Sequence, residues 1–161
     1  MIIFAHQLIL NCDFMNPIKF SISISAPAEK VWKALWNEPN YNKWTSVFSE
    51  GSHAETDWKE GSKVLFLDGK GSGMSSVIDK VVPNRQMTFK HLGMVKDGVE
   101  LPPDEKSKEW AGAKESYYLS EENGITELKV EMDATQEFEQ YFNDIFPKAL
   151  SIVKQISESK P

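Results

Sequence analysis

Residues 135–159 read TQEFEQYFNDIFPKALSIVKQISES, and this stretch decides the fold. Thr135 is the expected N-cap of a helix, and Glu137 places a carboxylate in its first turn. A helix of this length must bury its apolar face against a large partner, which the strand-rich middle of the sequence can provide. We therefore predict a curved sheet closed by this helix, with the function between the two. The apolar side chains recur every three or four residues, as on one helical face: Phe138, Tyr141, Phe142, Ile145, Phe146, Ala149, Ile152, Val153 and Ile156.

Pro147 interrupts this helical pattern. A proline in a helix interior removes one backbone hydrogen bond and clashes with the carbonyl four residues earlier, here that of Asn143. We predict a kink or break near residues 143–146, with the apolar face continuing beyond it.

The rest of the chain divides into a strand, two short helices and a series of strands. Residues 18–25 alternate apolar and polar side chains, which is typical of a half-buried strand. The segments AEKVWKALW (28–36) and NYNKW (40–44) are predicted helices, the first beginning after Pro27 and ending before Pro39. Further strands are expected at 49–58, 63–67, 74–82, 86–95, 114–119 and 125–132, with a polar loop of low order at 101–108.

Short turns join these strands, and they predict an antiparallel meander with the helices on one side. Asn123-Gly124 is the strongest hairpin signal in the chain. The segment DGKGSG (68–73) is a flexible hairpin connection, because its spacing does not fit a phosphate-binding loop.

Composition limits the classes of function. The chain has 161 residues and a net charge of −6, which suits one globular domain and argues against nucleic-acid binding. The single cysteine, Cys12, cannot form an internal disulfide, so we expect a cytoplasmic protein. The apolar segment before Met15 is too short for a membrane span and lacks the features of a signal peptide. We assign residues 1–15 to an amino-terminal extension and 16–161 to the domain. Two interpretations of the extension are open, an upstream start codon and an extra strand or plug, and its apolar character favours a homodimer.

Several pieces of the sequence, in this order, resemble the START-related helix-grip superfamily (SRPBCC), and within it the branch of the activator of heat-shock chaperone ATPase. The pieces are ISISAPAEKVWKAL, the turn WKEG (58–61), VP (82–83) followed by MTFKHLG, ESYYL (115–119), TEL (126–128) and FPKALSIVKQI. The resemblance covers about residues 18–158. It implies an α+β helix-grip fold, in which an antiparallel sheet of about seven strands wraps around the C-terminal helix over an apolar cavity.

No catalytic motif or metal-ligand spacing is present in the sequence, and no cofactor is predicted. His91 shares a strand face with Met87 and Phe89, so it becomes a candidate acid-base or ligand-orienting group if that face points inward. The alternative is a solvated or hydrogen-bonded histidine at a strand end. Glu115 and Tyr117 share another face, and a carboxylate in an apolar cavity could act as an acid or base. The alternative is a glutamate at the cavity mouth or paired with a lysine.

The remaining candidate ligand contacts are large apolar side chains that could equally be plain core: Trp44, Phe66, Met74, Phe89 and Phe142. Three hypotheses follow. The first is a binding protein for a small hydrophobic molecule such as a lipid, a polyketide-like or an aromatic compound. The second is an enzyme of the cyclase or hydrolase type that uses the same cavity. The third is a chaperone regulator that acts through its surface. An apolar cavity favours the first, a polar one the second, and a filled core the third.

Overall fold

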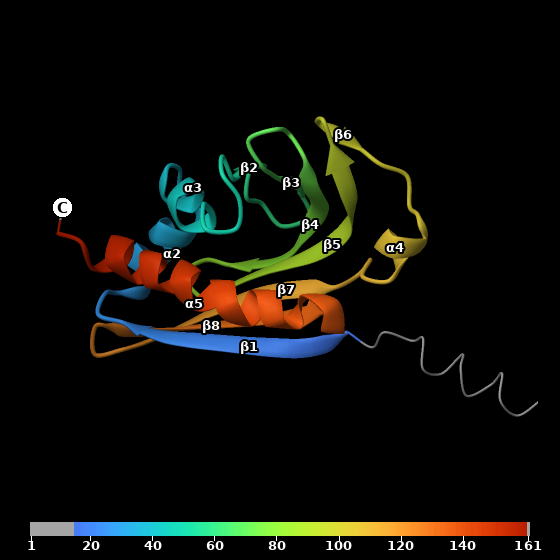
Figure 1. The fold of residues 1–161 in the computed structure, drawn as a ribbon. Coiled ribbons are helices and arrows are strands. Elements are labelled where there is room, and N and C mark those ends of the chain that lie inside the picture. The colour runs from blue at the N-terminus through green and yellow to red at the C-terminus, as the bar shows by residue number, and fades with distance from the viewer. Residues whose placement is uncertain (1–14, 161) are drawn as a thin grey trace, which may run out of the picture.

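The computed structural model describes residues 15–160 and places the long C-terminal helix across one face of a curved antiparallel sheet (Figure 1). The predicted extension therefore lies almost wholly outside the described residues. The strands are β1 (Asn16–Ile24), β2 (His53–Glu55), β3 (Lys63–Leu67), β4 (Gly73–Val82), β5 (Gln86–Lys96), β6 (Val99–Glu100), β7 (Lys114–Glu122) and β8 (Ile125–Ala134). The helices are α2 (Ala28–Trp36), α3 (Asn40–Thr45), α4 (Glu105–Lys108) and α5 (Gln136–Glu158).

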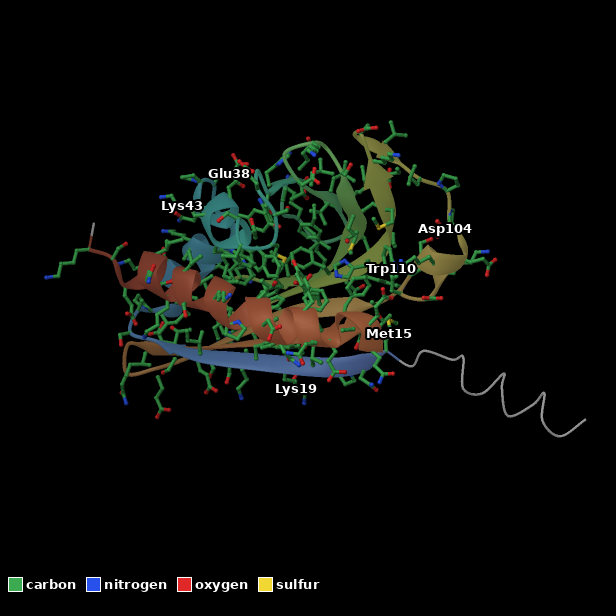
Figure 2. All side chains as sticks on the ribbon, in the orientation of Figure 1. Met15, Lys19, Glu38, Lys43, Asp104 and Trp110 are labelled. Carbon is green, nitrogen blue, oxygen red and sulfur yellow. The ribbon has the colours of Figure 1, made fainter. Side chains whose placement is uncertain are left out.

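The strand order is β1-β8-β7-β5-β4-β3-β2, with β6 paired to β5, and every pairing is antiparallel. The predicted α+β helix-grip fold is thereby confirmed. Sequence alternation explains which face is covered, because Ile18 and Ile24 of β1 are buried while Lys19 is exposed. Figure 2 shows Lys19 projecting from the face of the sheet opposite α5. On β8, the alternate residues Thr126, Leu128, Val130 and Met132 are buried on the inner face.

The backbone conformation of Asn123-Gly124 confirms the hairpin that the sequence predicts between β7 and β8. Asn123 and Gly124 both have positive φ angles, 53° and 76°, as the tight turn between β7 and β8 requires. Helix α2 covers the predicted residues and begins after Pro27.

The C-terminal half of α5 forms the tight contact with the sheet. Phe146, Ala149 and Val153 are fully buried, and so is Leu150, which the predicted apolar face omitted. Phe138 and Tyr141 were predicted to belong to the buried face, but they are 41% and 42% exposed. The first half of the helix is therefore less closely packed than the second.

Three local predictions were wrong. Helix α5 is not broken at Pro147 but runs without interruption, because burial on both sides of the proline holds adjacent turns in place. Strand β2 has three residues instead of ten, because turn hydrogen bonds such as Phe48 N–H to the Thr45 carbonyl (2.9 Å) take the preceding segment. The segment 101–108 contains the short helix α4, which a reciprocal capping box between Asp104 and Ser107 stabilises.

Candidate functional site

A cavity of about 590 Å³ lies between the sheet and the helices α3 and α5. Strands β3, β4, β5, β7 and β8 supply one wall, and the first half of α5 supplies part of the other. The lining is mainly apolar. Seven of the eight predicted site residues line this cavity: Trp44, Phe66, Met74, His91, Glu115, Tyr117 and Phe142.

Phe89 is the predicted site residue that does not line the cavity. It is 1% exposed and lies behind the wall, where its ring meets that of Phe66 edge-to-face at 5.1 Å between centroids. A second edge-to-face contact joins it to Tyr117 at 6.3 Å. Phe89 therefore supports two of the rings that do face the cavity.

A chain of hydrogen-bonding groups crosses the sheet at the cavity wall. The Tyr117 hydroxyl donates to Glu115 Oε1 at 2.6 Å, and His91 Nε2 lies 3.3 Å from Glu115 Oε2. On the other side of the imidazole, Nδ1 lies 2.7 Å from Ser76 Oγ. Only about a tenth of the His91 side chain and a sixth of the Glu115 side chain are exposed (11% and 16%). His91, Glu115 and Tyr117, which the sequence singled out on two separate strands, thus meet in one cluster.

Strand register explains why the cluster forms. Glu115 pairs with Phe89 across β5 and β7, so it lies diagonal to His91 on the same inner face. Ser76 lies directly opposite His91, in a short part of the β4–β5 ladder that register shifts bound at Ser75/Ser76 and at Ile78/Lys80. The register outside these shifts would place Val77 opposite His91 instead. The two irregularities therefore bring the serine hydroxyl to the imidazole.

Ser76 was missed by sequence reasoning, since no local signal marks a bulge or its cross-strand partner. The residue is fully buried and does not line the cavity. It is therefore inaccessible to a ligand as a nucleophile, and its contact orients the imidazole of His91.

Two tyrosines are affected by the charge of this cluster. Burial raises the pKa of Tyr117 well above its ordinary value, and the neighbouring Glu115 carboxylate raises this pKa further. Burial followed by the same carboxylate also raises the pKa of Tyr41. Both phenols therefore remain protonated at neutral pH and act as hydrogen-bond donors.

Aromatic side chains of α3 form the wall that faces this cluster. The Trp44 indole N–H donates to the Leu35 carbonyl at 2.9 Å, which satisfies the buried nitrogen and fixes the ring. Tyr41 packs edge-to-face on Trp44 at 5.5 Å and lies almost parallel to Phe66 at 6.4 Å. Both α3 residues and Phe66 line the cavity, so the aromatic wall is rigid and continuous.

Part of the cavity lining near the start of α5 is exposed. Met94, Trp110 and Phe138 line this end, and Met94 and Phe138 are both more than two-fifths exposed. Thr135 also lines the cavity, and its buried hydroxyl has no hydrogen-bond partner among residues 15–160. Although Thr135 is the N-cap residue of α5, its side chain does not cap the helix.

Three further observations concern the described residues outside this cavity. A depression of about 650 Å³ lies between the start of α2 and the β4–β5 turn, but it shares no residue with the cavity or the polar cluster. No group of three or more His, Cys, Asp or Glu side chains in residues 15–160 could hold a metal ion. Within the same residues, each helix is too short or too polar to traverse a membrane.

The sheet, the gripping helix and the enclosed cavity define a helix-grip domain. The family model described as "Activator of Hsp90 ATPase homolog 1-like protein" matches residues 25–148, and the chain belongs to that family. A comparison with curated proteins gave no match.

Several solved structures share this fold. The crystal structure of CalU16 from Micromonospora echinospora is 23% identical, with a TM-score of 0.59 over 88% of this chain and 76% of that chain. The Aha1 dimer from Colwellia psychrerythraea is 19% identical, with a TM-score of 0.63 over 91% of this chain and the whole of the other. DynU16, a protein of the dynemicin biosynthetic locus, is 16% identical with a TM-score of 0.64, and the match covers 89% of this chain but 47% of DynU16.

Proposed function

We propose that this protein binds a small, largely apolar molecule, such as an aromatic or polyketide-like compound or a lipid, in the cavity between the sheet and α5. The observation that carries the proposal is an apolar cavity of about 590 Å³ with one polar cluster on its wall. Ligand sites typically enclose about 300–1,000 Å³ and combine apolar walls with a few polar groups that orient the ligand. Here the apolar walls provide affinity, at about 25 cal/mol for each Å² removed from water. His91, Glu115 and Tyr117 provide orientation.

Two of the similar structures support parts of this proposal. DynU16 belongs to the locus of a biosynthetic pathway, and the same fold in such a setting is compatible with binding a biosynthetic molecule. The Colwellia protein is a dimer, which supports the homodimer that the apolar amino-terminal segment favours in this chain. Both inferences rest on a shared fold at low identity.

The proposal is tested with a substitution that fills the cavity. Ala113 is buried against the cavity, whereas Ala111, two residues earlier, is exposed. The Ala113→Phe variant should bind the neutral fluorescent probe N-phenyl-1-naphthylamine at least tenfold more weakly than the wild type. Ala111→Phe, the matched control, should bind it as the wild type does. Native mass spectrometry of the purified wild type should also detect a co-purified small molecule. Equal probe binding by both variants, with unchanged melting temperatures, would refute the proposal.

An enzyme is the second candidate, and the contact between His91 and Glu115 favours it. A buried histidine beside a carboxylate can take up and release a proton, and Tyr117 adds a donor at the same point. The two functions differ in what happens to the bound molecule. A compound released unchanged after prolonged incubation with the protein indicates binding alone, and a change in its mass that Glu115→Gln abolishes indicates an enzyme.

A chaperone regulator is supported by the family description rather than by the site. Such a protein would act through its surface, so stimulation of a chaperone ATPase should be equal for the wild type and Ala113→Phe. Stimulation that the cavity-filling variant retains, together with absent probe binding by the wild type, would favour this function over ligand binding.

A further inference from the structure

The acidic side chains that line the cavity are not matched by any lysine or arginine of the described lining. Three carboxylates line the cavity, those of Asp68, Glu115 and Asp133, together with His91. No lysine or arginine is present among the described residues of the lining. An anionic ligand such as a fatty acid would therefore meet carboxylates and find no cationic partner.

The three carboxylates are not equivalent. Asp68 Oδ1 accepts the backbone N–H groups of Lys70 and Ser72, at 2.8 and 3.0 Å, so it stabilises its own turn. Asp133 Oδ2 accepts the backbone N–H of Lys114 at 3.0 Å. Glu115 instead points to other side chains of the cavity wall, and both of its described contacts are with residues that line the cavity. It is the carboxylate best placed to meet a ligand.

The arrangement around Glu115 leaves a negative charge for a ligand to balance. His91 Nε2 lies 3.3 Å from Glu115 Oε2, and the Tyr117 hydroxyl donates to the other carboxylate oxygen. No lysine or arginine of the described cavity lining pairs with this carboxylate.

Besides the Glu115 carboxylate, aromatic rings of the cavity lining can also attract a cation. Tyr41, Trp44, Phe66 and Tyr117 all line the cavity, and their rings form one connected cluster. The faces of such rings attract an ammonium group, and the attraction strengthens where water is excluded.

From this combination we propose that the cavity selects molecules with a positively charged amine on a flat apolar body, and that the ammonium lies against Glu115. This inference rests on the proposed function and names the class of its ligand. The raised pKa values of Tyr41 and Tyr117 agree with it, since the carboxylate that disfavours a phenolate in the cavity favours a cation there.

The test uses three compounds that share a naphthalene body: 1-naphthylmethylamine, 1-naphthylmethanol and 1-naphthylacetic acid. Isothermal titration calorimetry of the full chain at pH 7 should show the amine binding at least tenfold more tightly than the alcohol, and the acid most weakly. Glu115→Gln should remove the preference, so that the variant binds the amine and the alcohol with affinities within about threefold of each other.

Glu122→Gln is the matched control, because Glu122 lies exposed on the same strand and the substitution removes the same charge. It should keep the full preference for the amine. Equal affinities for the three compounds, or tightest binding of the acid, would overturn the inference while leaving ligand binding itself intact. Binding of none of the three by a folded wild type would overturn both proposals. If Glu115→Gln melts well below the wild type, Glu115→Asp serves instead, and it should retain the preference for the amine.

Discussion

Replacing Phe146 with alanine tests whether α5 grips the sheet as described. Phe146 is 1% exposed, stacks on Phe20 of β1 at 4.9 Å and meets Phe48 edge-to-face at 5.2 Å. Removing a fully buried phenylalanine side chain typically costs about 3–5 kcal/mol, the loss of apolar burial plus the cavity left behind. Because Phe146 also borders existing empty space, we expect the lower part of this range, about 3–4 kcal/mol.

Phe138 provides the comparison on the same helix. Its side chain is 41% exposed, so Phe138→Ala should cost only about 1 kcal/mol. Urea denaturation followed by circular dichroism gives both free energies of unfolding, and an unchanged m-value would show that both variants unfold from equally compact states. The melting temperature of Phe146→Ala should fall by about 6–16 °C. Equal costs for the two substitutions would refute the tight contact between the second half of α5 and the sheet.

Two further predictions concern the tyrosines and a glycine. The free energy of unfolding should fall as pH rises above about 10, by about 1.4 kcal/mol per pH unit for each of Tyr41 and Tyr117, because the unfolded chain releases phenolic protons that the folded chain retains. Between pH 10 and 11 the unfolded phenol is only partly ionised, so urea titrations of Tyr117→Phe should show a loss of stability smaller than that of the wild type by about 1 kcal/mol. An unchanged loss would contradict the burial of this phenol. Gly73→Ala should cost more than about 2 kcal/mol, since a Cβ there would overlap the backbone carbonyl of Phe66. Gly98→Ala, where a Cβ meets open space but φ is +76°, should cost about 1 kcal/mol in the same urea assay, and equal costs would contradict the close approach at Gly73.

The sequence predicted most of the fold because its local signals agree with one another. Alternation in residues 18–25, the prolines that flank α2 and the Asn123-Gly124 turn each specify an element by local physics alone. The errors fall where tertiary contacts decide. The turn that follows α3 is held by its own hydrogen bonds, so residues with acceptable strand patterns remain outside the sheet.

The candidate site could be predicted only in part, and strand parity shows where the limit lies. Parity places His91 on one face with Phe89 and Glu115 on one face with Tyr117. It does not say whether those faces point inward, which strands pair or at what register. That these residues meet depends on the pairing of β5 with β7, and Ser76 joins them through a bulge that no residue type announces. Phe89 shares the inner face yet does not reach the cavity, because depth within a core is a property of packing rather than of alternation.

The position of the cavity follows from how burial changes along α5. In the second half of the helix the side chains toward the sheet include Ala149 and Val153, which are short and fully buried, so the backbone lies close to β1. In the first half Phe138 and Phe142 are only partly buried and line the cavity instead of filling it. A close contact at one end and large side chains at the other leave space beneath the first half of the helix. At the same end Thr135 lines the cavity, and its buried hydroxyl does not cap the helix.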